Sequence, residues 1–290
     1  MRFRKASLSM ALVCLAVVPA AAQDQGTGPG KVMVILREEI KPARIAAHER
    51  AESAYPRAFR AAKVPVYYVG MRTLTGSPEA WFISSYQSYE AYEQENDLID
   101  KNAALGKQLE RADDGDAPFR TGQSNMILEL KEDLSYGMRP TVQDMRYMTA
   151  VIMRVRPGYG ETFHELRKAI KEAHEKTKVD EHWALYQVNS GMPAGTYVLL
   201  SGSMGMKEFD TDPHSQAYRD AIGDTGRERM QKFQREGMLS SDVITLAFAP
   251  KMSNVPDAWI KARPDFWSAP AAPEKTTMAA PVAPAKVGSQ

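Results

Sequence analysis

The chain has 290 residues, of which 25% are charged and 43% hydrophobic, and its mean hydropathy is −0.42. At roughly 100–200 residues per domain, this length suggests two domains. The 37 basic and 36 acidic residues leave a formal charge of +1. No sequence-wide field therefore exists that would hold nucleic acid or an anionic membrane, and polyanion-binding classes of protein are disfavoured.

Residues 1–22 have the pattern of a secretory signal peptide. Three basic side chains within the first five residues precede an apolar run at 8–18, and Ala20-Ala21-Ala22 supplies the small residues of a cleavage site. The apolar run is shorter than the roughly 20 residues that a transmembrane helix needs. We expect an exported protein, periplasmic or secreted, with no membrane span.

Cleavage after residue 22 would change both the charge and the redox chemistry of the chain. It removes three basic residues and leaves 34 basic and 36 acidic residues in a chain of 268. It also removes Cys14, the single cysteine. The mature chain would then have no thiol, which excludes disulfides, cysteine nucleophiles and thiolate metal sites.

The rest of the chain contains an internal repeat, which is the strongest indication of its architecture. The matching blocks lie 116 or 117 residues apart; they are 34–37 with 151–154, 48–49 with 164–165, 81–83 with 197–199, and 124 and 127 with 241 and 244. Each match is weak alone. The common offset indicates two copies of one structural unit.

Both copies predict the same order of elements from their apolar spacing and turn residues. In the first copy, the expected segments are a strand at 31–37, a helix at 42–62, strands at 64–71 and 80–85, a helix around 98–109 and a strand at 125–130. In the second, they are a strand at 147–155, a helix at 160–178, strands at 183–188 and 196–201, a helix around 218–233 and a strand at 242–248. Pro56 is expected to kink the first helix or to begin its second half.

The order β-α-β-β-α-β, found twice, is the ferredoxin-like arrangement. We therefore predict an α+β fold with two tandem ferredoxin-like units. A sheet with helices on one side must cover its other face, so the two sheets should pair. The expected segments are a signal peptide at 1–22, units at 23–135 and 148–250 joined by a linker at 136–147, and a C-terminal extension at 251–290 that is Pro/Ala-rich and disordered from about 269.

The two units resemble the dimeric α/β-barrel superfamily, which includes NIPSNAP and antibiotic-biosynthesis-monooxygenase-like domains. The resemblance covers about Lys31 to Pro250 and rests on the element order, the aromatic strands and a histidine on each first helix, His48 and His164. It implies a barrel formed within one chain, a monomeric pseudo-dimer. Members include cofactor-independent oxygenases, haem-dependent enzymes and proteins without known activity, so the reaction stays open. No cofactor is predicted, and haem stays open.

His48 and His164 are the candidate catalytic residues, because histidine titrates near neutral pH. A packed structural histidine is the alternative at both positions. No metal site is predicted, since helices on opposite sides of a barrel would hold these imidazoles apart. Arg37 and Arg154 would bind a carboxylate if they point into the barrel, and would otherwise be solvated strand ends.

Aromatic side chains concentrate on the central hairpins, where they would line an apolar ligand cavity or fill the core. These candidate ligand-binding residues are Tyr67, Tyr68, Trp81, Trp183, Tyr186 and Tyr197. The leading hypothesis is an exported protein that binds an apolar or aromatic small molecule inside the barrel. The alternatives are a cofactor-independent oxygenase that uses His48 or His164, and an envelope scaffold that uses the outer helices and the Pro-rich tail.

Overall fold

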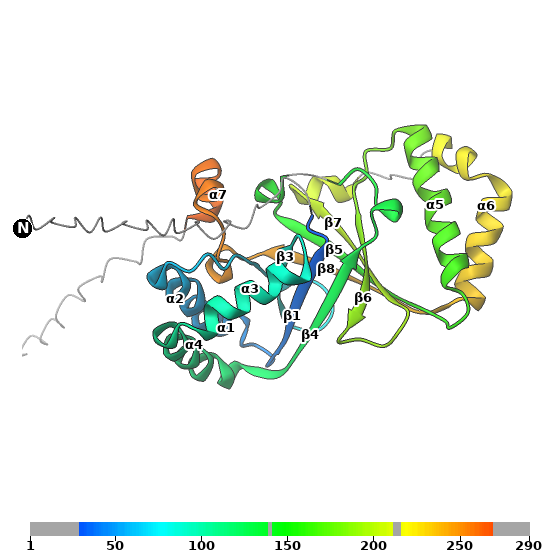
Figure 1. Cartoon of the computed structure of the whole chain (residues 1–290). Helices are drawn as coiled ribbons and strands as arrows, with labels where there is room; N and C mark the ends of the chain where they lie inside the picture. The colour runs from blue at the N-terminus through cyan, green and yellow to red at the C-terminus, as the bar shows by residue number, and fades with distance from the viewer. Residues whose placement is uncertain (1–28, 139–140, 211–215, 269–290) are drawn as a thin grey trace, which may run out of the picture.

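The computed structural model describes residues 29–138, 141–210 and 216–268. Within these ranges, eight strands close into an antiparallel barrel in the order β1-β3-β2-β8-β5-β7-β6-β4 (Figure 1). The strands are β1 (Val32–Ile40), β2 (Val69–Thr73), β3 (Glu79–Tyr86), β4 (Arg120–Leu130), β5 (Tyr147–Val155), β6 (Ala184–Ser190), β7 (Thr196–Ser203) and β8 (Met238–Phe248). The predicted α+β fold, with two ferredoxin-like units paired into one barrel, is confirmed.

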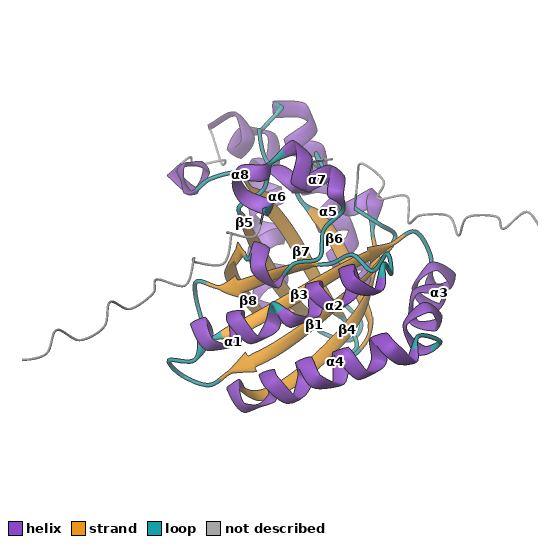
Figure 2. Cartoon of the chain, turned by 90° about the vertical axis from the view of Figure 1, so that its left-hand side faces the viewer, coloured by secondary structure: helices purple, strands orange, loops and turns teal. Residues whose placement is uncertain are grey.

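The helices cover the outside of this barrel. Figure 1 shows the helices of the first unit on one side and those of the second unit on the other, and Figure 2 shows α1, α2 and α4 lying across the first sheet. They are α1 (Ile45–Glu52), α2 (Ala54–Ala62), α3 (Tyr89–Asp100), α4 (Ala103–Asp116), α5 (Gly160–Thr177), α6 (Gln216–Glu236), α7 (Asp257–Ala262) and α8 (Pro264–Trp267). No helix in the described ranges is long and apolar enough to cross a membrane.

Local sequence explains where the first unit's helices begin and end. The first helical segment breaks at Ser53, and Pro56 lies in the first turn of α2, where its missing N–H costs no hydrogen bond. Ser88 caps α3 by accepting a hydrogen bond from the N–H of Ala91 at 3.1 Å. Asn102 likewise accepts from the N–H of Leu105 at 3.0 Å and begins α4. Pro56 therefore begins the second half of the predicted helix, as expected.

Strand pairing shows that the predicted repeat alignment is wrong at β3 and β7. Leu36 lies opposite Phe82 in the first unit, and Met153 lies opposite Tyr197 in the second. Phe82 therefore corresponds to Tyr197, whereas the sequence alignment placed Trp81 there. A slip of one residue moves a side chain to the other face of a strand. Trp81 faces the barrel interior, whereas Tyr197 packs under α5.

Alternate strand residues divide the core into an interior and an outer layer. Ile35, Ile152 and Val198 belong to the buried cluster inside the barrel. On the outer face of the second unit, Val155 and Tyr197 pack with residues of α5 and α6. Side chains of neighbouring strand positions therefore enter two chemically separate spaces.

Residues that follow the second unit fold onto one end of the barrel. Trp267, at the end of α8, is 2% exposed and belongs to the interior core cluster. Its indole N–H donates to the carbonyl of Gln143 at 2.8 Å, and its ring packs against Phe248. The predicted signal peptide and the predicted disordered tail at 269–290 lie outside the described residues.

Candidate functional site

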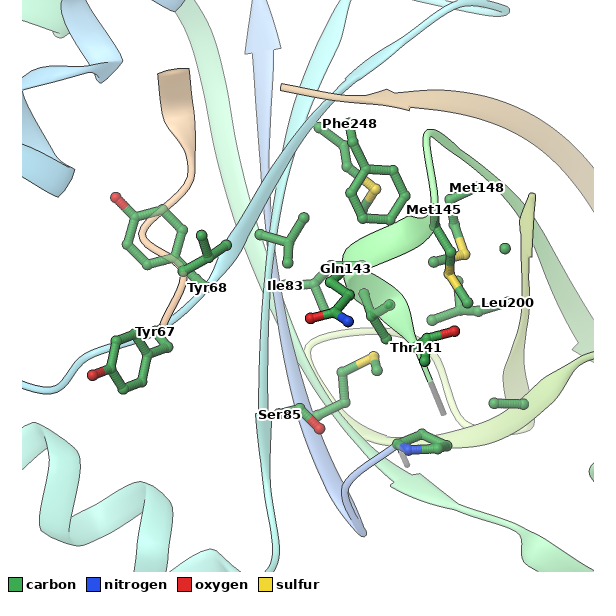
Figure 3. A pocket seen from close by; sticks show the side chains of 18 of the residues that line it. Tyr67, Tyr68, Ile83, Ser85, Thr141, Gln143, Met145, Met148, Leu200 and Phe248 are labelled. Carbon is green, nitrogen blue, oxygen red and sulfur yellow. The ribbon is translucent and has the colours of Figure 1, made fainter. Parts of the chain in front are cut away.

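A cavity of about 290 Å³ opens inside this end of the barrel. Both units contribute strands to its wall, together with the segment that precedes β5. Its lining is dominated by sulfur, aliphatic and aromatic groups, which include Met33, Met71, Ile83, Met145, Met148, Tyr186, Leu200 and Phe248 (Figure 3). Methionine side chains are flexible and polarisable, so this wall can adapt to a planar apolar molecule.

The few polar groups of the cavity differ in whether they already have partners. Tyr186 donates from its hydroxyl to the carbonyl of Gly30 at 3.3 Å, and Ser85 accepts from the N–H of Gly30 at 2.8 Å. Burial raises the pKa of Tyr186, so its hydroxyl stays protonated. The carboxamide of Gln143 forms no hydrogen bond with the described part of the chain, and Figure 3 shows it beside Thr141. Gln143 is half-buried, whereas Gln87 and Thr141 of the same lining are exposed, so Gln143 is the less solvated of the polar side chains that a ligand could pair with.

The described lining of the cavity carries no Lys, Arg, Asp or Glu side chain. His182 is its one titratable imidazole, and both ring nitrogens have partners. Nε2 lies 2.9 Å from Oδ1 of Asp180, and Nδ1 contacts the carbonyl of Gly137. The cavity therefore favours an uncharged molecule, because a buried charge without a partner is costly.

Four of the six predicted aromatic residues belong to the cavity wall: Tyr67, Tyr68, Trp183 and Tyr186. Figure 3 shows the rings of Tyr67 and Tyr68 apart from the side chains of Thr141 and Gln143. The Tyr68 ring packs against Phe82 on the outer face of the sheet, so this residue contributes little more than its backbone to the cavity. Trp183 donates its indole N–H to the carbonyl of Leu134 at 2.9 Å.

Trp81 and Arg37 lie together at the opposite end of β1 from the cavity. Arg37 donates to both carboxylate oxygens of Glu79 at 2.8–3.0 Å, and Trp81 donates to the same carboxylate at 2.7 Å. The guanidinium carbon lies 4.7 Å from the centre of the Trp81 ring. Arg37 therefore already has a carboxylate partner within the chain. Arg154, its counterpart, is exposed at the end of β5.

His164 and Tyr197 contact each other outside the barrel, under α5. Nε2 of His164 lies 3.2 Å from the hydroxyl of Tyr197, and the imidazole is half-buried. Neither residue belongs to the cavity lining. A histidine that the sequence did not single out, His174, is more buried, and its Nε2 lies 2.6 Å from Oε2 of Glu181.

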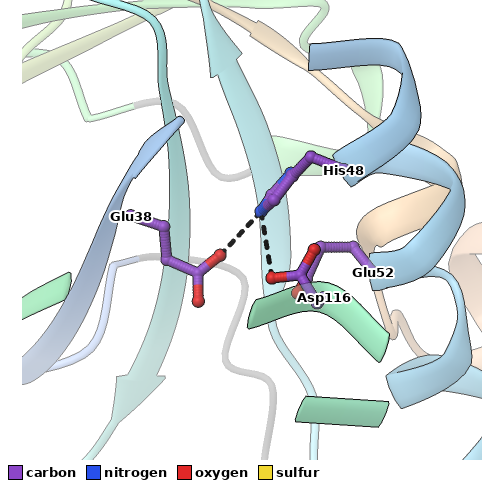
Figure 4. A group of neighbouring side chains, drawn as sticks. All are labelled: Glu38, His48, Glu52 and Asp116. Atoms are coloured by element: carbon purple, nitrogen blue, oxygen red, sulfur yellow. Dashed lines mark hydrogen bonds and ion pairs between the residues drawn. The ribbon is translucent and has the colours of Figure 1, made fainter. Parts of the chain in front are cut away.

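His48 lies in a buried charged cluster between β1 and helices α1 and α4 (Figure 4). Its Nε2 lies 2.8 Å from Oε2 of Glu38 and 3.5 Å from Oδ2 of Asp116. Arg120 contacts the other oxygen of Glu38 at 2.8 Å and Oδ2 of Asp116 at 2.9 Å. Glu52, one turn after His48 on α1, completes the group. The prediction of no metal site considered two distant histidines, whereas the structure gathers three carboxylates around one of them.

Burial dominates the protonation of this cluster. It raises the pKa of Glu52 to about 10, with further contributions from the nearby charges of Glu38 and Asp116. Burial also raises the pKa of Asp116, although His48 and Arg120 oppose the change. Three closely spaced carboxylates in a dry layer cannot all stay ionised without positive charge beside them.

Part of this cluster could have been recognised in the sequence. His48 and Glu52 are four residues apart, which places them on one face of a helix. Successive side chains of a strand face opposite sides of the sheet, so Glu38 points out of the barrel where Arg37 points into it. Asp116 and Arg120 come from a distant helix end and strand, and no local pattern connects them with His48.

Solved structures with the same arrangement of strands and helices include proteins with different descriptions. A "putative monooxygenase" from Fusobacterium nucleatum matches with a TM-score of 0.51 and 12% identity, over 75% of this chain and 92% of that chain. The fold that the two proteins share is an eight-stranded α/β barrel. A "putative monooxygenase" from Lactobacillus acidophilus matches with a TM-score of 0.49 and 12% identity, over 77% and 94% of the two chains. A heme-binding protein from Thermus thermophilus matches with a TM-score of 0.42 and 12% identity, over 81% and 94%.

These similarities establish the fold and leave the activity open. The Fusobacterium protein is too distant in sequence to carry more than the fold, and the other two TM-scores are below 0.5 and support no argument. No protein-family model matches the chain, and no curated protein matches it in sequence.

Neither His182 nor Tyr186 of the described cavity is free to serve as an axial ligand of haem. Haem iron takes an axial ligand such as a histidine or tyrosine, and methionine usually serves beside a histidine. His182 has partners at both ring nitrogens, and the Tyr186 hydroxyl is bonded to Gly30. The described lining also offers no Lys or Arg to pair with the propionates.

Proposed function

We propose that this protein binds a small, uncharged molecule with one or two aromatic rings in the barrel cavity. The observation that carries the proposal is an apolar cavity of about 290 Å³ that both units build and that faces no charged side chain of the described lining. A dry cavity of about 150 Å³ lined by apolar side chains can hold benzene. The larger volume here suits a molecule of two fused rings.

The Gln143 carboxamide gives this site a preferred ligand chemistry. It can donate through its NH₂ group and accept through its carbonyl oxygen, so it pairs with either a hydroxyl or a carbonyl. A ligand without such a group would leave the carboxamide unpaired inside an apolar space, which weakens binding. We therefore assign the site to aromatic alcohols, phenols or ketones.

A binding role fits the placement of the titratable groups better than turnover does. His48 and His164 both lie outside the barrel wall, in the layers under α1 and α5, and neither lines the cavity. An acid or base must come within hydrogen-bond reach of the atom that it serves. The oxygenase hypothesis that used these two histidines therefore has no support from the geometry.

The proposal includes export as a monomeric pseudo-dimer and a relationship to NIPSNAP-like domains. Export is supported by the basic start, apolar run and alanine-rich cleavage site at 1–22. A single chain that closes its own barrel needs no second copy to cover its sheets. Expression of the full chain with a bacterial secretion system tests the export and the monomeric state. We expect an extracytoplasmic product that begins at Gln23 and elutes as a monomer.

The binding proposal is tested with three related probes and one variant. We expect 2-naphthol to bind, naphthalene to bind more weakly, and naphthalene-2-sulfonate not to bind, because the described lining offers no cation to pair with the sulfonate. Gln143→Leu should remove the preference for 2-naphthol over naphthalene, a loss of about 0.5–1.5 kcal/mol or roughly two- to twelvefold. Equal affinity for 2-naphthol and its sulfonate analogue would contradict the proposal, as would no binding of either neutral probe.

A further inference from the structure

The charged layer outside the barrel has the geometry of a cation site. Glu38, His48, Glu52 and Asp116 each offer one ligand atom, and all four atoms lie within 4.8 Å of one another (Figure 4). The four residues are 3%, 1%, 4% and 0% exposed. We propose that this cluster binds one divalent transition-metal ion, of the Zn²⁺ or Mn²⁺ type, through Nε2 of His48 and one oxygen of each carboxylate.

Unpartnered oxygen atoms aimed into the cluster indicate that something is bound there. Oε1 of Glu52 and Oδ1 of Asp116 are fully buried and accept no hydrogen bond from an N–H or hydroxyl group of the described structure, so in the metal-free chain only a proton held between the two carboxyl groups serves them. Buried carboxylate oxygens normally accept hydrogen bonds or coordinate metals, because their desolvation is otherwise uncompensated. A cation at the centre would satisfy both atoms together.

The formal charges favour a divalent ion. When all three are ionised, Glu38, Glu52 and Asp116 carry three negative charges, and Arg120 carries one positive charge that it shares among Glu38, Asp116 and the exposed Asp113. Burial keeps Glu52 protonated in the metal-free chain, and a bound cation would ionise it, which gives the three carboxylates and Arg120 a formal charge of −2. One divalent cation would bring this layer to neutrality, as a buried ionic group requires.

The second unit shows that the fold does not need a cluster of carboxylates at this place, although Arg167 of α5 is buried there against Trp183. The outward positions of β5, Met153 and Val155, both carry apolar side chains, whereas Glu38 occupies an outward position of β1. Val155 packs with Phe163 of α5 and Phe233 of α6 in an apolar cluster. Apolar side chains therefore fill this layer adequately, and packing alone does not explain the carboxylates of the first unit.

The donor set selects the class of metal. One imidazole with three carboxylates suits zinc, manganese or iron, whereas Ca²⁺ and Mg²⁺ prefer oxygen donors alone. Ligands about 2.1 Å from a tetrahedral centre are roughly 3.4 Å apart. Nε2 of His48 lies 3.5 Å from Asp116, which matches that value, and 2.8 Å from Glu38, which is a hydrogen-bond distance that would have to lengthen when the ion binds. Arg120 would hold both carboxylates in place from outside the ligand set.

Metal content and thermal stability of the full chain test the proposal. After dialysis against EDTA and then buffer, titration with ZnCl₂ by calorimetry and with MnCl₂ by electron paramagnetic resonance should each show about one ion per chain. At a hundredfold excess of ZnCl₂ over its Kd, the melting temperature should rise by roughly 5 °C. A chain that binds neither ion and does not change in melting temperature would overturn the proposal, and would leave a proton shared by the carboxylates as the occupant.

Variants locate the ion within the molecule. Glu52→Gln and Asp116→Asn keep the size of each side chain but remove a ligand charge, and each should weaken binding at least tenfold. His164→Gln is the matched control, because it changes the repeat-related histidine outside the cluster and should bind the ion as the native chain does. Circular dichroism of the metal-free variants establishes that they are folded. Unchanged affinity in folded Glu52→Gln and Asp116→Asn chains would place the ion elsewhere and refute the assignment.

Discussion

Two tryptophan substitutions should distinguish an open cavity from a filled core. Leu200 projects from the inner face of β7, is 6% exposed and lines the cavity. Ile152 projects from the inner face of β5, is 7% exposed and belongs to the same core cluster, but it does not line the cavity. Leucine and isoleucine have the same number of atoms, so Leu200→Trp and Ile152→Trp add the same bulk in different surroundings.

The expected magnitudes follow from the space beside each residue. An indole at position 200 can extend into the cavity of about 290 Å³, so we expect a cost below about 1 kcal/mol. Ile152 is surrounded by packed side chains, where added atoms force strained rotamers and backbone shifts that cost about 3 kcal/mol. The difference of about 2 kcal/mol corresponds to roughly 4–8 °C in melting temperature for a chain of this size.

Thermal and urea unfolding measure the stability of each variant, and fluorescence titration with 2-naphthol measures binding. The indole of Leu200→Trp would occupy the place of the ligand's rings, so its affinity should fall at least tenfold, or about 1.4 kcal/mol. Equal destabilisation by the two substitutions would show that the interior is filled at both positions. A stable Leu200→Trp chain with native affinity would show that 2-naphthol binds elsewhere, and would refute the cavity as the ligand site.

Two further substitutions test the packing around the site. Trp267→Ala should cost about 3–5 kcal/mol and lower the melting temperature by roughly 6–20 °C, because it removes a buried ring and one of the two donors to the Gln143 carbonyl, the other being Arg146. A decrease below 3 °C would show that α8 adds little to the core. Arg167→Met should leave stability unchanged or raise it by up to about 1 kcal/mol, because the guanidinium Nε is buried without a partner and burial lowers the pKa of Arg167 to about 10. The guanidinium is charged in both the folded and unfolded chain from pH 6 to 9, so urea unfolding should give the same difference in unfolding free energy between the variant and the native chain across that range. A loss of stability above about 1.5 kcal/mol would mean that the contact of Arg167 with the Trp183 ring outweighs the cost of burying the guanidinium.

The strands were predictable where their apolar residues alternate and uncertain where they carry polar residues. The predicted strand at 147–155 has the bounds of β5, whose alternate faces meet two apolar layers. β4 begins at Arg120 and β8 at Met238, four or five residues before the predicted starts. Their first halves are mostly exposed, with a polar run in β4 and Ser240, Ser241 and Asp242 in β8, and they are strands because they pair with β1 and β5. Such pairing is a tertiary effect that local composition does not express.

The candidate site was predictable in composition but not in the direction of its side chains. The aromatic hairpins indicated correctly that rings gather on the central strands, and Trp183 and Tyr186 do line the cavity. The sequence alignment of the two copies was off by one residue between β3 and β7. It therefore matched Trp81, which faces the interior, with Tyr197, which faces outward. Gln143 was missed because it belongs to the predicted linker, where no periodicity marks a buried face.

The two copies of the unit have become chemically unequal in a way that a single chain permits. In a homodimer, every substitution in the layer between sheet and helices appears twice, so a charged cluster and an apolar one could not occupy equivalent places. Here Glu38 and His48 occupy a charged layer in the first unit, whereas Val155 and Phe163 lie in an apolar layer in the second. The apolar layer supplies packing energy and desolvates fewer ionisable groups than the charged layer does, Arg167 being the buried cation within it. Fusion of the units therefore allows one copy to stabilise the barrel while the other holds a costly cluster of ionisable groups, and both still share the walls of one cavity.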